Sequence, residues 1–198
     1  MSGKAKKTTA FIIKTIAPIF NKKGYVGTSM SDLTEATGLT KGALYGNFKN
    51  KEALALAAFE YNSKLLSKVI DEKLTIKGNA LDKIFSLTKF YQNYDIFTLN
   101  MGGCPIVNTG IDAQNSNRLL AAASKEVIQE IEGKIALVLE NGVKNKDIHL
   151  PVTPLQFAKQ MFTMIQGAIT TSTITKDRKY LYNTIAYLEV LIKKEIKK

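Results

Sequence analysis

The chain has 198 residues, 45% of them hydrophobic, and a formal net charge of +11. This composition supplies a sizeable apolar core and favours a polyanionic partner. No apolar run is long enough to span a bilayer, and a single cysteine and a single histidine exclude a disulfide framework and a His/Cys metal cluster. We therefore expect a cytoplasmic protein without a cofactor, a metal or a membrane partner.

The first predicted helix covers residues 8–23 and contains Pro18, which removes one backbone hydrogen bond and predicts a bend. Gly24 follows it as a break in the pattern. Apolar residues at helical spacing form its expected buried face: Phe11, Ile12, Ile16, Ile19 and Phe20.

Two short helices joined by a tight turn are predicted next. Ser29 can cap the first of them, with Asp32 three positions later completing a capping box. Gly38 suits the left-handed conformation that ends this helix, and Thr40 is the N-cap candidate of the second. Leu44 then points inward. This arrangement is typical of a helix-turn-helix that places its second helix in the DNA major groove.

The outer face of the second short helix carries small or hydrogen-bonding residues, which can approach base edges closely. An ordinary helical hairpin with a solvated outer face is the alternative. The residues of this face are Thr40, Lys41, Gly42, Ala43, Tyr45 and Asn47.

A longer set of residues resembles the N-terminal domain of the tetracycline-repressor (TetR) family. The motifs are Gly24-Tyr25, Thr28-Ser29-Met30, Asp32-Leu33, Gly38-Leu39-Thr40-Lys41-Gly42-Ala43-Leu44-Tyr45, Phe48, and Lys49-Asn50-Lys51-Glu52-Ala53-Leu54. Two positions depart from the family pattern: Thr34 stands where alanine is usual, and Gly46 where many members have an aromatic residue or histidine.

The resemblance implies an all-α fold, with a three-helix helix-turn-helix DNA-binding domain in residues 1–50 and a larger helical ligand-binding and dimerisation domain in residues 51–198. It also implies double-stranded DNA with a palindromic operator as partner. Within the expected DNA-binding set, Thr28, Tyr45 and Lys51 contact the backbone and residues 40–43 face the bases. The full set is Thr28, Ser29, Thr40, Lys41, Gly42, Ala43, Tyr45, Asn47 and Lys51.

The remainder of the chain also reads as helices, because apolar residues recur at spacings of three and four. Asn50 is the expected cap of a long fourth helix, which carries Lys51 in its first turn and serves as a mechanical link between the domains. Gly142 is the expected end of one later helix. The further predicted helices cover residues 79–94, 103–113, 116–141, 153–175 and 177–197.

The final predicted helix has two apolar stripes, and one stripe suffices for its own core. The first consists of Leu181, Ile185, Leu188 and Ile192, and the second of Tyr180, Tyr187 and Leu191. Periodicity alone leaves two readings open: a thick monomeric core, or a homodimer through the last two helices. The family resemblance favours the homodimer.

Aromatic and thioether side chains predict an adaptable pocket for a small apolar or aromatic effector, since no charged residue stands out as a counter-ion. Ordinary core packing is the alternative for each of them. The candidate ligand-binding residues are Tyr61, Phe90, Phe97, Met101, Cys104, Met161, Met164 and Ile165.

Cys104 begins a segment, Cys104 to Asn108, that resembles the GC-x-x-x-N motif of one TetR branch. A thiol in the first turn of a helix is stabilised as thiolate, which is the basis of a thiol- or electrophile-sensing alternative. A buried structural cysteine is the simpler reading. In sensor members of that branch a lysine on a later helix captures the oxidised sulfur, and here only Lys176 stands nearby.

The function expected from these features is a ligand-responsive, homodimeric transcriptional regulator, usually a repressor in this family. An enzyme is not expected, because the chain has no Ser/His/Asp set, no phosphate-binding loop and no dinucleotide-binding glycine pattern. A sequence-tolerant architectural DNA-binding protein is the alternative from a different class.

Overall fold

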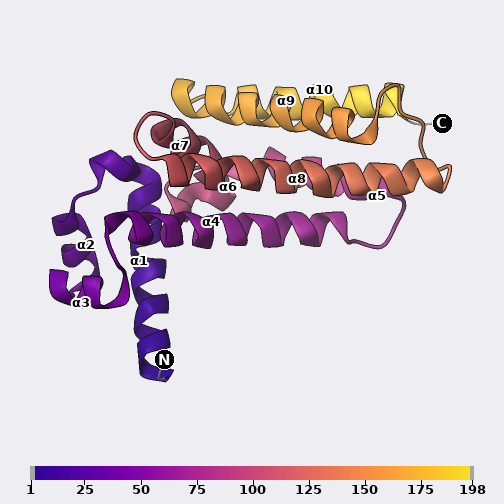
Figure 1. Ribbon diagram of the computed structural model, residues 1–198. Helices are drawn as coiled ribbons and strands as arrows, with labels where there is room; N and C mark the ends of the chain where they lie inside the picture. The colour runs from indigo at the N-terminus through magenta and orange to yellow at the C-terminus, as the bar shows by residue number, and fades with distance from the viewer. Residues whose placement is uncertain (1–2, 197–198) are drawn as a thin grey trace. The chain divides into compact units, whose positions relative to one another are not determined.

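The computed structural model describes residues 3–196, which form helices and no β-strand (Figure 1). This confirms the predicted all-α class. None of the described helices is long and apolar enough to cross a membrane. The helices are α1 (Gly3–Gly27), α2 (Met30–Thr37), α3 (Lys41–Asn47), α4 (Lys51–Leu74), α5 (Ala80–Gln92), α6 (Tyr94–Thr98), the 3-10 helix η1 (Leu99–Met101), α7 (Pro105–Ala113), α8 (Arg118–Lys144), α9 (Pro154–Thr175) and α10 (Lys179–Glu195).

Two compact units share the chain. The first contains the residues up to Leu66 together with Phe97–Val127, and the second contains Ser67–Ile96 together with the residues from Ile128 onward. Both α4 and α8 begin in the first unit and continue into the second. The functional boundary expected between residues 50 and 51 stays a prediction. The compact units do not follow it, because the first unit contains α7 as well as the helix-turn-helix.

The helix-turn-helix follows the local rules read from the sequence. Ser29 and Asp32 form the predicted capping box, with the Asp32 amide donating to Ser29 Oγ at 3.1 Å. Gly38 has the left-handed conformation, with φ at 66°. Thr40 Oγ1 accepts from the Ala43 amide at 3.1 Å and caps α3. Each such cap stabilises its helix by about 1 kcal/mol.

The first helix begins earlier than predicted, since α1 begins at Gly3. Its predicted end before Gly24 is confirmed: the backbone at Gly24 is non-helical, with φ at 74° and ψ at 174°, and one further turn then reaches Gly27. The bend expected at Pro18 is not the place where the helix breaks. The prediction that Phe11 is buried was wrong, because 51% of its surface is exposed.

The core of the first unit is built from α1 to α4 with contributions from α7 and α8. Leu33 of α2 and Leu44 of α3 are fully buried in it, which positions both short helices against α1. The buried members are Ile12, Ile16, Ala17, Phe20, Leu33, Leu44, Leu54, Ala55, Ala58, Phe59, Ala113 and Leu120.

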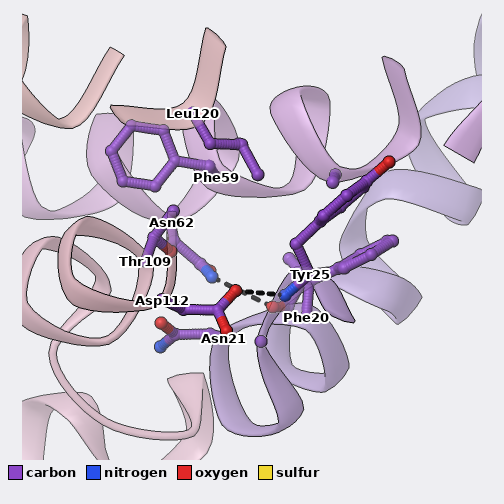
Figure 2. A pocket seen from close by; sticks show the side chains of 11 residues that line it. Phe20, Asn21, Tyr25, Phe59, Asn62, Thr109, Asp112 and Leu120 are labelled. Atoms are coloured by element: carbon purple, nitrogen blue, oxygen red, sulfur yellow. Dashed lines mark hydrogen bonds between the residues drawn. The ribbon is translucent and has the colours of Figure 1, made fainter. Parts of the chain in front are cut away.

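Polar contacts join α7 and the turn before it to the end of α1. Asp112 Oδ2 accepts a hydrogen bond from the Tyr25 amide at 2.6 Å (Figure 2). Asn21 Nδ2 donates to the Met101 carbonyl at 2.6 Å and to the Gly103 carbonyl at 2.8 Å. The turn before α7 and the last turn of α7 are therefore both hydrogen-bonded to α1.

In the second unit, α10 packs against α9 and α5. The first predicted stripe of α10 is buried, as expected: Leu181, Ile185, Leu188 and Ile192. Thr88 of α5 also donates to Glu189 Oε1 at 2.7 Å. The second stripe is not covered within the unit, because Tyr180 is 48% and Tyr187 59% exposed, while Leu191 is half-buried.

Several predicted helix ends were wrong. The predicted helix 79–94 is α5 followed by a separate α6, and η1 lies in a stretch without a predicted helix. The helix expected from residue 103 begins at Pro105, with Cys104 as its N-cap. Gly142 does not end α8, which continues to Lys144; an added Cβ at Gly142 would overlap the Ala80 side chain, so close packing explains this glycine. The expected end of the last helix at 197 lies outside the described residues.

Candidate nucleic-acid interface

One stripe of α3 is exposed. Lys41 and Tyr45 lie four residues apart on it, as do Gly42 and Gly46, whereas Leu44 is buried on the opposite side. Residues four apart in a helix share a face. Because two members of this stripe have no side chain beyond hydrogen, a DNA groove can approach the backbone of α3 closely.

The charged end of the stripe is organised by an aromatic ring. Lys41 Nζ lies 5.9 Å from the centroid of the Tyr45 ring, which is within the range of a cation–π contact. Thr40 is exposed at the start of the helix, and Ala43 is half-buried. The stripe therefore combines one cation, one ring and a hydroxyl with two positions of minimal bulk.

Asn47 does not lie on the exposed stripe, which corrects its predicted orientation. Its Nδ2 donates to the Ala43 carbonyl at 3.0 Å, and its Oδ1 accepts from Thr9 Oγ1 at 2.9 Å. The side chain is half-buried. Its amide thus ties the C-terminal end of α3 to α1, so it supports the orientation of the recognition helix.

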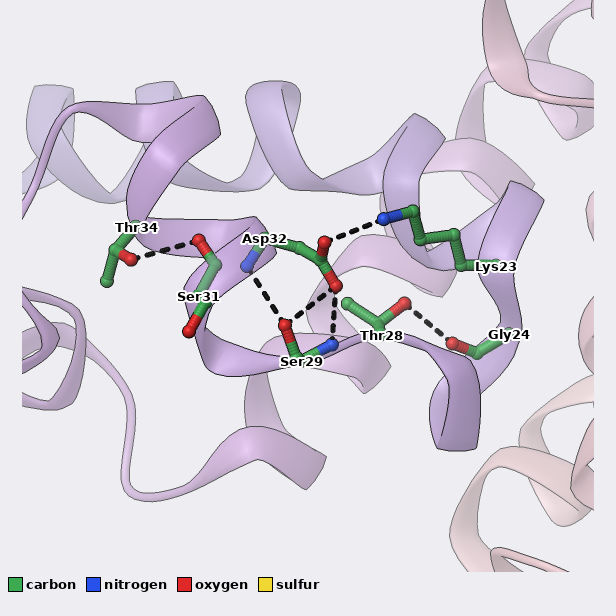
Figure 3. A network of polar contacts seen from close by, with 7 residues as sticks. All are labelled: Lys23, Gly24, Thr28, Ser29, Ser31, Asp32 and Thr34. Atoms are coloured by element: carbon green, nitrogen blue, oxygen red, sulfur yellow. Dashed lines mark hydrogen bonds and ion pairs between the residues drawn. The ribbon is translucent and has the colours of Figure 1, made fainter.

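Thr28 is also turned inward, contrary to the expectation of a backbone contact. It is fully buried, and its Oγ1 donates to the Gly24 carbonyl at 2.7 Å (Figure 3). Ser29 is exposed, and its hydroxyl takes part in the capping box at the start of α2. The hydrogen bonds of Thr28 and Ser29 therefore hold the connection between α1 and α2 in place.

An ion pair between Lys23 and Asp32 also stabilises the connection between α1 and α2. Lys23 Nζ lies 2.6 Å from Asp32 Oδ1 (Figure 3). The hydrogen bond from Lys23, followed by those from the Ser29 amide and hydroxyl, lowers the pKa of Asp32 from 3.8 to about 2. Asp32 thus remains an anion that holds both the end of α1 and the N-terminus of α2 at neutral pH.

The first turn of α4 lies against the end of α1. Lys51 is half-buried, and its Nζ lies 4.7 Å from the centroid of the Tyr25 ring. The neighbouring Glu52 Oε1 accepts from Asn117 Nδ2 at 2.8 Å, just before α8. The position of Lys51 is therefore set by aromatic and polar contacts within the first unit.

Two family models match this chain. Residues 12–58 match "Bacterial regulatory proteins, tetR family", and residues 80–188 match "Tetracyclin repressor-like, C-terminal domain". The chain belongs to the TetR family. It is a helix-turn-helix, DNA-binding transcriptional regulator, so the resemblance seen in the sequence is confirmed.

Solved structures and characterised relatives agree with this assignment. A TetR-family transcriptional regulator from Cytophaga hutchinsonii is 36% identical, covers 100% of both chains and has a TM-score of 0.92. A TetR transcriptional regulator from Chloroflexus aurantiacus is 28% identical over 99% of both chains, with a TM-score of 0.92. The HTH-type transcriptional repressor NemR of Escherichia coli is 23% identical over 93% of this chain and 94% of its own length. These relatives are transcriptional regulators and not enzymes.

The eight candidate ligand-binding residues divide between the units. Tyr61, Phe97, Met101 and Cys104 belong to the first unit, and Phe90, Met161, Met164 and Ile165 belong to the second. Met101, Cys104, Met161 and Ile165 are buried, and the other four are half-buried. Phe90 also packs edge-on against Tyr94, with ring centroids 5.7 Å apart. Their burial agrees equally with core packing, so their contact with an effector stays a prediction.

Cys104 is 5% exposed and precedes α7 as its N-cap, so the expectation that it lies in the first turn was wrong by one residue. In the same motif, Asn108 Nδ2 donates to the Asn21 carbonyl at 3.0 Å and to the Gly102 carbonyl at 3.1 Å. In the sequence, we interpreted this motif only through its thiol. Asn108 of the motif was the one sequence feature that could have indicated a polar contact with α1. No sequence feature indicated the hydrogen bond between Asp112 and the Tyr25 amide.

Proposed function

We propose that this regulator is a homodimeric repressor that binds a palindromic operator and releases it when a small apolar or aromatic effector binds. The exposed stripe of α3, with its two glycines and the Lys41–Tyr45 pair, is the observation that carries the proposal. An operator-binding protein acts where the chromosome is, so a cytoplasmic location follows from it.

We assign direct base contacts to residues 40–43, since the start of a recognition helix faces base edges in a helix-turn-helix. Tyr45 and Lys51 are assigned to the phosphate backbone. Ser29, exposed at the N-terminus of α2, is suited to a phosphate contact as well. Asn47 and Thr28 act indirectly, by fixing α3 and the α1–α2 connection.

The second stripe of α10 supports dimerisation through α9 and α10. Two exposed tyrosines, next to the half-buried Leu191, form an apolar surface that a second copy can cover. Gly167 is exposed on α9, and an added Cβ would find open space there, so this helix also allows close approach. A two-fold axis would give two α3 helices, as a palindrome requires.

Release of the operator by an effector requires a structural element that takes part in both DNA binding and effector binding. The uninterrupted α4 carries Lys51 in its first turn and continues into the second unit, where the predicted effector residues Met161, Met164 and Ile165 belong. We propose that effector binding displaces α4 and thereby changes the separation of the two recognition helices. This is allosteric coupling between two sites through one element with two positions.

The thiol-sensing alternative is disfavoured by the burial of Cys104, because reactive cysteines lie in exposed, electropositive surroundings. Replacement of Cys104 by serine distinguishes the apolar-effector proposal from the thiol-sensing alternative. Under the main proposal, the Cys104→Ser variant still responds to an apolar effector. Loss of a response to thiol-reactive compounds in this variant would instead establish the sensor.

Selection of duplexes from a random pool, followed by binding measurements at physiological ionic strength, tests the proposal. We expect the selected palindrome to bind about 10³-fold or more tightly than random DNA. Equal affinity for both would overturn the proposal and favour an architectural DNA-binding protein.

A further inference from the structure

A small cavity lies within the first unit, between α1, α4 and α7 (Figure 2). Its volume is about 10 Å³. A polar cavity needs roughly 10–15 Å³ to hold one water molecule. The lining residues used below are Asn21 of α1, Asn62 of α4, and Thr109 and Asp112 of α7.

One side of the cavity carries an unmet hydrogen-bonding group. Asn21 is 4% exposed, and its Nδ2 is used by the Met101 and Gly103 carbonyls. Its Oδ1 is buried and accepts no hydrogen bond from any residue that the structure describes. Buried polar atoms in proteins are almost always paired with protein groups or ordered water. A water in the cavity would supply the missing donor.

The other sides supply the further partners that such a water needs. The Asp112 carboxyl also lines the cavity, and its Oδ2 accepts a hydrogen bond from the Tyr25 amide (Figure 2). Asn62 Nδ2 itself donates to the Ala17 carbonyl at 3.1 Å, which joins α4 to α1. Thr109 of α7 is the remaining polar residue of the lining, which thus draws polar residues from three helices. A site with two to four such partners retains a water, whereas an apolar cavity of this size stays dry.

We propose that this cavity binds one ordered water, which donates to Asn21 Oδ1 and to the Asp112 carboxylate and accepts from the Thr109 hydroxyl. The water makes the junction of α1, α4 and α7 a hydrated polar joint that holds the end of α1, and with it the entry to α2. Its part in signalling rests on the proposed function, in which movement of the effector-binding helices reaches the DNA-binding helices.

The water is tested directly on the full-length protein by a crystal structure that resolves ordered solvent and by water–amide cross-relaxation in solution. We expect one water within about 3.2 Å of Asn21 Oδ1. An empty cavity, or one closed by a rotated Asn21 amide, would overturn the site.

Two substitutions at one position test the joint. Thr109→Val keeps the shape and removes the hydroxyl, and Thr109→Ser keeps the hydroxyl. We expect Thr109→Val to weaken or expel the water and to accelerate hydrogen exchange in the segment 20–28 by about fivefold, the ratio for loss of one hydrogen bond. Thr109→Ser should keep both the water and the slow exchange.

Unchanged exchange in Thr109→Val after loss of the water would overturn the joint, and a water that stays fully bound in Thr109→Val would overturn the assignment of the Thr109 hydroxyl as its partner. Thr163→Val, at an exposed position of α9, is the matched control and should leave exchange in the segment 20–28 unaltered. None of these measurements requires DNA, so they can succeed or fail independently of operator binding.

Discussion

The position that a Cβ atom would occupy at Gly24 lies 2.7 Å from the carboxyl carbon of Asp112, and Gly24 has a positive φ of 74°. The end of α1 and the last turn of α7 therefore meet at a place where only glycine fits.

Substitution of Gly24 by alanine should destabilise the protein, because it combines left-handed strain with a clash against the Asp112 carboxyl. We expect a loss of about 1–3 kcal/mol in the free energy of unfolding, measured by denaturant titration. Gly133→Ala is the control: this exposed helical glycine has open space around it, and the change should stabilise by up to about 1 kcal/mol. Equal effects at both positions would remove the argument for a tight junction.

Tyr45→Ala should weaken operator binding by about tenfold or more and leave thermal unfolding nearly unchanged, since the ring is exposed and organises Lys41. Tyr45→Phe keeps the ring and removes only the hydroxyl. Fluorescence anisotropy with the selected operator separates the two roles: a large loss in both variants assigns the contact to the hydroxyl. Wild-type affinity in Tyr45→Ala would count against the assigned face.

The low pKa of Asp32 predicts a pH-dependent contribution to stability. A folded-state pKa of about 2, below the ordinary value of 3.8, means that the folded state favours the ionised carboxyl. This contribution is fully present above about pH 4 and is lost as the pH falls through 2. The difference in melting temperature between the wild type and Asp32→Asn should therefore shrink over this range. Glu35→Gln, also on α2, provides the baseline for removal of one charge, and a difference that stays constant with pH would contradict the assignment.

Tyr187→Glu should convert the protein from dimer to monomer, because it places a charge within the exposed stripe of α10. Sedimentation velocity measures the change. Leu137→Glu, at an exposed position of α8, is a control for an added surface charge and should not alter the sedimentation of the dimer. A wild-type profile for Tyr187→Glu would eliminate the interface proposed on α10.

The helix-turn-helix could be predicted in detail because its signals are local. Capping by Ser29, Asp32 and Thr40 and the turn at Gly38 depend on residues within three or four positions of one another. The buried stripe of α10 was predictable for the same reason. By contrast, the hydrogen bond between Tyr25 and Asp112 joins residues 87 positions apart, and no local pattern marks either of them as partners.

Tertiary packing also explains the residues that were misjudged. Asn47 was expected to face outward because of its position in a short helix, but Thr9 supplies a partner for its amide from α1. Gly142 was read as a helix end, whereas the side chain of Ala80 requires a residue without a Cβ there. In both cases the deciding neighbour lies far away in the sequence.

The recognition helix has seven residues, two of them glycines, and such a segment has little tendency to stay helical in isolation. Its shape depends on the Thr40 cap at one end and on the bond between Asn47 and Thr9 at the other. A change of operator preference made by grafting this helix into another regulator must therefore transfer its support on α1 together with the residues that read the DNA. Grafted without that support, the seven residues would lose their order and, with it, their selectivity.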